Sequence, residues 1–217
     1  MPYFKSNGCE VSQGNSKIGT DTLILNMGSA TRCPSKAKGL CKLGRRCYAL
    51  KAEIMYDNTL PYRDRQADYW LNTSAKKIAS ALSTIILKLN KKSRVIDYIR
   101  FNESGDFWSQ ADVSKLDKVA GYVRAETGVV VYGYTARKDL NFSKVTSFLV
   151  KGSSNGAGNN GETIARHPQI VHDNSAFLRD RNYYNEAGKM YAVCPGNCRI
   201  CIICKIKNDT NVVFPIH

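Results

Sequence analysis

Short β-prone runs alternate with amphipathic helical stretches along the first two thirds of the chain. Between the first two runs, four apolar residues recur at steps of four, three and four, which places them on one face of a helix. Alternating strands and helices predict βαβ units, so we expect an α/β fold with a mainly parallel sheet, similar to a partial (β/α) barrel. The runs are TLILNM (22–27), VIDYIRF (95–101), VVVYGY (129–134) and VTSFLV (145–150), and the helical residues are Ile78, Leu82, Ile85 and Leu89.

Further features complete the predicted organisation. Ser109 followed by Asp112 is typical of a helix start. The glycine- and asparagine-rich stretch 152–162 predicts a loop. A chain of 217 residues with 43% hydrophobic residues is large enough for a real core. We therefore predict one compact unit, with an α/β partial-barrel-like domain over 1–193 and a cysteine-rich C-terminal segment over 194–217 packed on it.

Seven of the eight cysteines fall into two groups, and Cys9 lies apart from both. The N-terminus lacks the basic start and apolar run of a signal peptide, so we expect a reducing, intracellular compartment, where clustered cysteines favour metal binding over disulfides. The groups are a first-loop triad (Cys33, Cys41 and Cys47) and a C-terminal tetrad (Cys194, Cys198, Cys201 and Cys204).

The spacing inside the tetrad favours an iron–sulfur cluster. Cys198, Cys201 and Cys204 form C-x2-C-x2-C, the run that binds three corners of a [4Fe–4S] cluster in ferredoxins. A zinc site more often uses two separate C-x2-C pairs, so zinc is the alternative. The seven clustered cysteines can be divided between one or two metal centres in two ways. Either the tetrad binds one centre and leaves the triad with an open position, or Cys194 completes the triad.

Polar residues follow the predicted strands where a parallel sheet gathers its functional groups. Glu103 and Asp106 follow VIDYIRF, and Arg137 follows VVVYGY. We expect Glu103 and Asp106 to handle protons or position a substrate, and Arg137 to contact an anion. The alternative interpretation is that Asp106 caps backbone amides and that Glu103 pairs with a cation.

The net charge of +14 is concentrated in the first half of the chain. Residues 32–51 contain seven cations and no acid. This basic stretch predicts binding of nucleic acid or another phosphate-bearing ligand, or compensation of thiolate charge. The apolar stretches are too short to span a bilayer, and no feature indicates a host protein partner. The cations are Arg32, Lys36, Lys38, Lys42, Arg45, Arg46 and Lys51.

Several motifs together resemble a known family. They are CPSKAKGLCKLGRRCYALKAE, YRDRQ, YIRFNESGDFWSQ, YGYTARKDL and CPGNCRICIIC. The combination resembles the gene-product-eighty-eight family of cysteine-rich bacteriophage proteins, over roughly residues 20–205. This resemblance implies a phage-encoded protein that works in the cytoplasm of an infected bacterium, and it implies no particular reaction.

A looser resemblance is to radical S-adenosylmethionine enzymes, which place three cluster-binding cysteines after the first strand of a partial barrel. The triad has a similar position, although its spacing is C-x7-C-x5-C in place of C-x3-C-x2-C. We therefore expect an iron–sulfur protein with redox or radical-type activity at a cluster held by the triad. The alternative is a basic nucleic-acid-binding protein with structural zinc or iron–sulfur sites.

Overall fold

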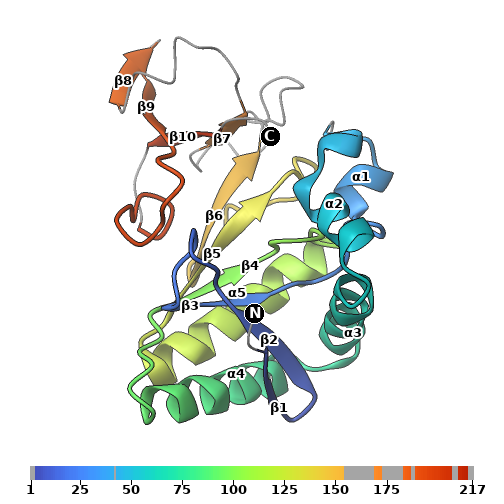
Figure 1. Cartoon of the computed structure of the whole chain (residues 1–217), viewed down its shortest axis with the longest axis vertical. Coiled ribbons are helices and arrows are strands. Elements are labelled where there is room, and N and C mark those ends of the chain that lie inside the picture. The colour runs from blue at the N-terminus through green and yellow to red at the C-terminus, as the bar shows by residue number, and fades with distance from the viewer. Residues whose placement is uncertain are drawn as a thin grey trace.

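The computed structural model describes residues 3–41, 43–153, 169–172, 183–186, 189–206 and 210–214. The described strands form one ten-stranded sheet (Figure 1). In spatial order they are β1 (Tyr3–Ser6), β2 (Cys9–Gln13), β3 (Thr22–Leu25), β4 (Tyr98–Phe101), β5 (Val130–Thr135), β6 (Phe148–Ser153), β7 (Gln169–His172), β10 (Asn211–Phe214), β9 (Lys189–Val193) and β8 (Tyr183–Glu186).

The sheet is mostly parallel. From β3 through β4, β5, β6, β7 and β10 to β9, every neighbouring pair is parallel. The β1–β2 hairpin and β8 add antiparallel strands at the two edges. The α/β class with a mainly parallel sheet is thus confirmed. Of the loop expected at 152–162, residues 154–162 lie outside the described residues.

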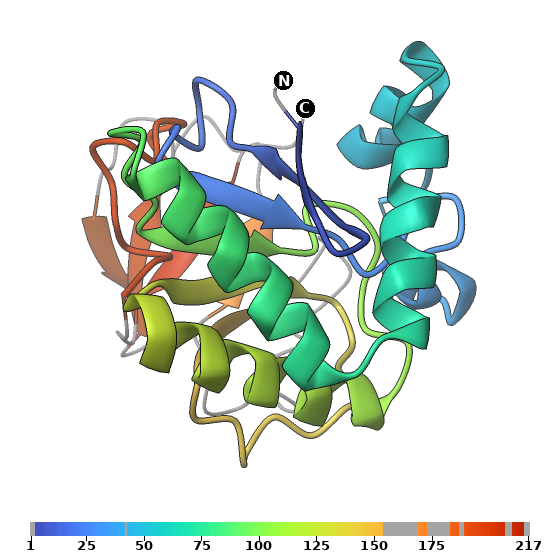
Figure 2. The same cartoon turned by 90° about the horizontal axis from the view of Figure 1, so that it is seen from below.

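Two long helices pack side by side on one face of the sheet (Figure 2). They are α4 (Ala75–Asn90), which precedes β4, and α5 (Gln110–Thr127), which connects β4 to β5. The predicted helix start is confirmed, because Ser109 and Asp112 form a capping box at the start of α5. The segment between β3 and α4 contains α1 (Pro34–Ala37), a 3-10 turn (Gly44–Arg46), α2 (Tyr48–Met55) and α3 (Thr59–Asn72).

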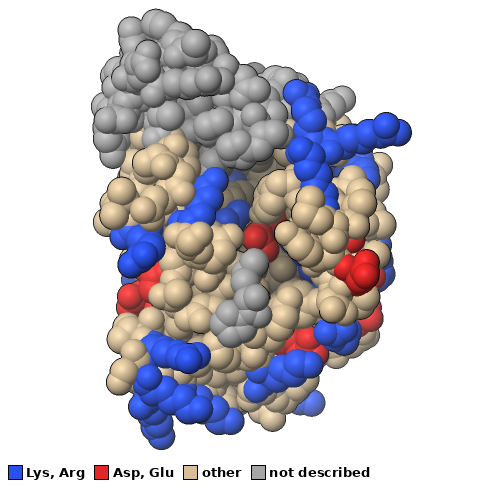
Figure 3. Space-filling view, viewed as in Figure 1, with Lys and Arg blue, Asp and Glu red and all other residues tan. Residues whose placement is uncertain are grey.

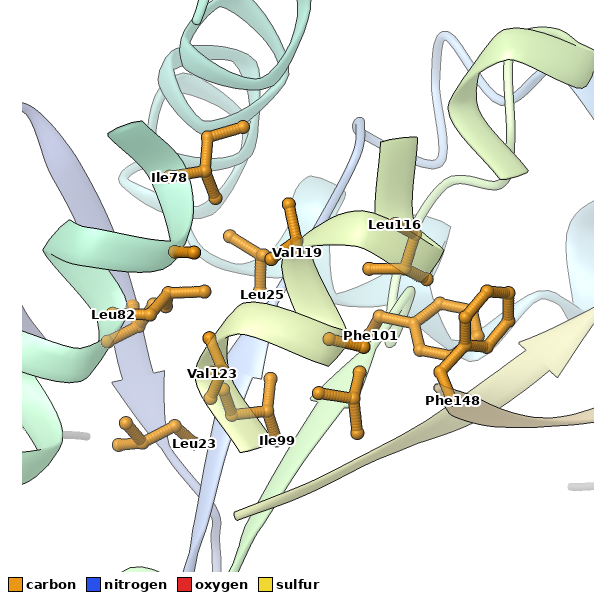
Figure 4. Packing of buried hydrophobic residues seen from close by; sticks show 14 of the residues in the cluster. Leu23, Leu25, Ile78, Leu82, Ile99, Phe101, Leu116, Val119, Val123 and Phe148 are labelled. Atoms are coloured by element: carbon orange, nitrogen blue, oxygen red, sulfur yellow. The ribbon is translucent and has the colours of Figure 1, made fainter. Parts of the chain in front are cut away.

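The main core lies between the sheet and these two helices (Figure 4). The strand register aligns Leu23, Ile99, Val131 and Phe148 in one row across β3 to β6. This row and the neighbouring Leu25 and Phe101 are buried against apolar residues of α4 and α5. From α4 these are Ile78, Leu82, Ile85 and Leu89, as the periodicity predicts, and from α5 they include Leu116, Val119 and Val123.

The opposite face of β4, β5 and β6 is aromatic and charged. Side chains alternate across a strand, so the residues between the core positions lie on this second face. We call it the tyrosine face, and it carries Tyr98, Arg100, Tyr132, Tyr134 and Lys151. Tyr132 contacts both Tyr98 and Tyr134, with ring centroids 6.2 and 6.5 Å apart. Strands of parallel sheets are usually apolar on both faces, so this composition is unusual.

Candidate metal centre and the strand-end network

The first-loop triad lies in the segment after β3, and two of its cysteines stand at the starts of helices. Cys33 directly precedes α1, and Cys47 directly precedes α2. Burial, together with the negative charge of Asp106, raises the pKa of Cys33 to about 12. Burial also raises the pKa of Cys41, with a contribution from Cys47. The three thiols are therefore electrostatic neighbours, free of disulfides, beside a buried carboxyl group.

The C-terminal tetrad lies against the tyrosine face. The backbone N–H of Cys198 donates to the carbonyl of Lys17 at 2.7 Å. Lys205 pairs with Asp21 at 3.3 Å, and its ammonium group lies 4.2 Å from the centre of the Tyr98 ring. These contacts join the cysteine-rich segment to the strands of the sheet.

Cations surround the tetrad thiols. Burial raises the pKa of Cys198, and the positive charges of Arg100 and Lys205 lower it. Burial likewise raises the pKa of Cys204, to about 11, although a hydrogen bond from Tyr134 and the charge of Lys151 act in the opposite direction. The environment therefore combines desolvation, which favours the thiol, with cations that favour the thiolate.

The two groups of cysteines are separate electrostatic clusters. Cys194 interacts with Cys198 and Cys201 of its own group. Cys41 interacts with Cys33 and Cys47 of the other group. Across the described part of the chain, no three His, Cys, Asp or Glu side chains stand in the arrangement of a metal site.

Asp106 is a buried cross-link between the loops that follow three strands. Its carboxylate accepts hydrogen bonds from Ser35 Oγ at 2.5 Å and from Thr135 Oγ1 at 2.6 Å. It also accepts from the backbone N–H groups of Ala136 and Phe107, both at 2.9 Å. Burial raises its pKa, although these hydrogen bonds act in the opposite direction. The contacts agree with the interpretation that Asp106 caps backbone amides, and its catalytic role stays a prediction.

Glu103 and Arg137 are also held by protein partners. Glu103 pairs with Arg63 at 3.7 Å, as the alternative interpretation expects. Arg137 is buried and forms a two-point ion pair with Asp139, at 2.7 and 2.8 Å. Its remaining terminal nitrogen donates to the carbonyls of Phe107 and Trp108. An anion at Arg137 would therefore compete with Asp139.

Sequence reasoning missed Glu53, the most highly connected carboxylate of this region. It accepts hydrogen bonds from the backbone N–H groups of Ala30 and Thr31, at 2.7 and 2.9 Å, and from Ser104 Oγ at 3.2 Å. It also pairs with Arg63 at 2.9 Å. The signal was present, because Glu53 ends the motif CYALKAE and Arg63 belongs to YRDRQ.

A buried amide pair extends this network. Asn26 Nδ2 donates to Gln66 Oε1 at 3.0 Å, and the N–H of Ser104 donates to Asn26 Oδ1 at 2.9 Å. Gln66 Nε2 in turn donates to the Glu10 carbonyl at 2.7 Å. Motif residues from four segments of the chain thus form one network at the carboxyl ends of β3 and β4.

Most of the basic stretch 32–51 faces solvent. Two of its cations form surface ion pairs, Arg32 with Asp64 at 3.7 Å and Lys38 with Asp139 at 3.9 Å. Lys42 lies outside the described residues. Figure 3 shows Lys and Arg side chains gathered in several groups around the face it displays. The exposed cations of the stretch include Arg32, Lys36, Lys38, Arg45, Arg46 and Lys51.

The fold and its contents define the class as an α/β protein with a mostly parallel sheet, whose strand-end loops carry a buried polar network and a cysteine triad. The family model described as gene product 88 matches residues 6–154, and the chain belongs to this phage protein family. The match includes the triad and the network, whereas the tetrad lies beyond it. Neither the curated proteins nor the solved structures give a match. None of the described helices is long and apolar enough to cross a bilayer.

Proposed function

We propose that this phage protein binds a [4Fe–4S] cluster through Cys194, Cys198, Cys201 and Cys204 and works in the cytoplasm of the infected host. The observation that carries the proposal is the packing of four neighbouring free thiols against a cationic, aromatic sheet face. A cluster with four thiolate ligands is anionic, so the positive charges of Arg100, Lys151 and Lys205 favour it.

The donor set fits this group. Thiolates are the ligands that iron–sulfur clusters and zinc share, and the C-x2-C-x2-C spacing distinguishes between them in favour of iron. Burial raises the pKa values of Cys194, Cys198 and Cys204. Thiol ligands must lose their protons on binding, so cluster uptake is pH-dependent. Ligand binding draws the four sulfurs into closer contact, since metal sites commonly form together with the segment that carries them.

The surrounding residues have defined tasks in this proposal. A bound cluster supplies one-electron transfer. Tyr134 donates a hydrogen bond to the sulfur of Cys204, and hydrogen bonds to ligand sulfurs raise a cluster's reduction potential. Lys205 is positioned by Asp21 and the Tyr98 ring, and its positive charge lies beside the tetrad thiols, where it would favour an anionic cluster.

The first-loop triad is the proposed second centre. Three thiols leave one position open for a substrate, at the mouth of what we propose is a partial barrel. Redox or radical-type chemistry there would have Asp106 directly beside Cys33. After reconstitution with iron and sulfide, reductive cleavage of S-adenosylmethionine is the expected activity. If the protein neither cleaves nor binds S-adenosylmethionine, the radical form of the proposal is wrong. That result would leave the proposed tetrad cluster unaffected.

Anaerobic purification tests the central proposal. We expect a brown protein with a broad absorption band near ~400 nm, and iron and sulfide in equal amounts. The double variant Cys198→Ser/Cys201→Ser should lose the band from the tetrad, whereas Cys9→Ala should retain the full spectrum because Cys9 is buried in the main core. A colourless protein with stoichiometric zinc would overturn the iron–sulfur assignment.

Nucleic-acid binding is the second candidate function, supported by the exposed cations of the stretch 32–51. Binding of single-stranded DNA or RNA, measured by fluorescence anisotropy, should weaken steeply with salt. Arg45→Gln/Arg46→Gln should weaken it more than Lys88→Gln/Lys91→Gln, which removes two exposed cations near the end of α4. Equal effects of the two double variants, or absence of binding at low salt, would exclude this function.

A further inference from the structure

Among the described residues, Arg100 is a half-buried cation without a partner anion. It lies in β4 on the tyrosine face, and its Nε atom is buried without a hydrogen-bond partner. Within the described residues, its guanidinium forms no ion pair. Buried polar groups are nearly always paired, because an unpaired buried charge loses its hydration without compensation.

The nearby carboxylates are occupied elsewhere. Glu103 interacts with the charge of Arg100, but its carboxylate lies 3.7 Å from Arg63. Glu53 also pairs with Arg63, at 2.9 Å. The neighbours of Arg100 are instead tyrosines, with the Tyr134 ring centre 5.0 Å from the guanidinium carbon. The positive charge therefore lies among aromatic rings and hydroxyl groups.

Arg100 also lies between the two cysteine groups. It interacts electrostatically with Tyr48, which follows Cys47 of the triad, and with Cys198 of the tetrad. The Tyr48 hydroxyl is fixed by donation to the Glu103 carbonyl at 2.6 Å.

We propose that the tyrosine face binds a small molecule through an oxoanion, a carboxylate or a phosphate, at the guanidinium of Arg100. The Nε–H and a neighbouring Nη–H form a planar pair of donors that matches two oxygens of such a group. The half-buried Tyr134 supplies a ring against which the rest of the ligand packs. The site would place an anionic substrate between triad and tetrad, and its binding does not require a metal at either group.

Thermal unfolding of the full-length protein tests the site with inorganic phosphate and with acetate, each compared with chloride at equal ionic strength. The better-matched oxoanion should raise the Tm of the wild type by several degrees at millimolar concentration. Arg100→Gln should abolish this rise and increase the Tm without ligand, because it removes a half-buried charge that no described acidic residue pairs with. Arg124→Gln, at an exposed position of α5, should behave like the wild type. A response to phosphate alone assigns a phosphate ligand, and a response to acetate a carboxylate.

A second measurement keeps the proposal testable if Arg100→Gln does not fold. The Nε–Hε NMR signal of Arg100, assigned by its absence in Arg100→Lys, should shift on addition of the same anion. Equal Tm rises in all variants would mean binding to the general basic surface and would overturn the site. The proposal would also be overturned if neither anion changed the Tm of the wild type and Cys198 were alkylated more slowly in Arg100→Gln. Arg100 would then act only by favouring the thiolate of Cys198.

Discussion

The carboxylate of Glu53 and the guanidinium of Arg63 form an ion pair of 2.9 Å, and the two side chains are 2% and 5% exposed. The pair connects α2 to α3. Glu53 also receives hydrogen bonds from Ala30 and Thr31 in the loop after β3. One buried carboxylate thereby fixes the loop that carries the triad.

Replacement of Glu53 by glutamine should destabilise the fold by about 3–5 kcal/mol, because Arg63 would keep a buried charge without its main partner. Urea unfolding measures the change. Glu126→Gln, at an exposed position of α5 without a recorded ion pair, should stay within about 0.5 kcal/mol of the wild type. If the free energy of unfolding fell by a similar amount in both variants, the Glu53–Arg63 pair would contribute no more to stability than an exposed glutamate.

The same pair predicts a pH dependence. Burial alone would raise the pKa of Glu53, but hydrogen bonds from Ala30, Thr31 and Arg63 lower it below its ordinary value of 4.5. A pKa lowered in the folded state stabilises the fold above the unfolded-state value, and this stabilisation is lost as the pH falls through the folded-state value. The difference between wild type and Glu53→Gln should therefore shrink as the pH drops below about 4.5. A constant difference from pH 7 to pH 3 would contradict this.

Two glycines offer a matched test of the turn that carries Asp106. Gly105 and Gly128 have φ angles of +72° and +75°. A Cβ on Gly105 would lie 2.6 Å from the Gly28 carbonyl oxygen, whereas one on Gly128 would meet nothing within 4 Å. Gly128→Ala should cost about 1–2 kcal/mol from its backbone conformation alone. Gly105→Ala should cost clearly more in urea unfolding, because the loops after β3 and β4 would have to separate.

The sequence was sufficient to predict the α/β class, the central strands β3 to β6 and the apolar face of α4, because apolar periodicity reports which side of an element is buried. It did not predict β1, β2, β7, β8 or β10. It did not show that α4 and α5 lie on the same face. The run VVVYGY is typical of a strand covered on both sides, and β5 is largely buried. The sequence did not show that its second face is covered by Arg100 and the cysteine segment, which lie beside Tyr132 and Tyr134.

The polar network was harder to predict. Glutamate and arginine in a helix are usually exposed to solvent, and Glu53 and Arg63 are buried only because of tertiary packing. Asp106 was located correctly as a loop residue after β4, but three of its four partners, Ser35, Thr135 and Ala136, come from distant segments that no local pattern places beside it.

Arg137→Lys should separate a structural role from an anion-binding role. Lysine cannot reproduce the two-point pair with Asp139 or reach both backbone carbonyls, so we expect a loss of about 2–4 kcal/mol. Lys138→Gln, at the exposed neighbouring position, is the control and should change stability little. Stability equal to the wild type in Arg137→Lys would mean that these contacts are dispensable, leaving the guanidinium available for a ligand.

Removal of the Tyr134 hydroxyl should make Cys204 less reactive in the metal-free protein. The pKa of Cys204 is raised to about 11 by burial, against a hydrogen bond from Tyr134 that lowers it. Tyr134→Phe abolishes this hydrogen bond, so the pKa should rise further. Less thiolate would be present at pH 8, so alkylation of Cys204 by iodoacetamide should slow by roughly two- to tenfold. Tyr98→Phe removes a hydroxyl from the same face and should leave the rate unchanged. Faster alkylation in Tyr134→Phe would contradict the hydrogen bond.

The partition of the seven clustered cysteines is open to a direct test. Electrostatic contacts group Cys194 with Cys198 and Cys201, so the tetrad should bind its centre without help from the triad. Cys33→Ser/Cys41→Ser should therefore keep the iron, sulfide and absorption that belong to the tetrad.

Cys194→Ser is the decisive single variant, because serine is a poor ligand for a cluster. If the tetrad is complete by itself, this variant should lose or destabilise the tetrad centre while the triad centre stays intact after reconstitution. If Cys194→Ser instead loses the triad centre, which Cys33→Ser/Cys41→Ser also removes, Cys194 belongs to the triad. The C-terminal segment would then close over the first loop to complete the triad site.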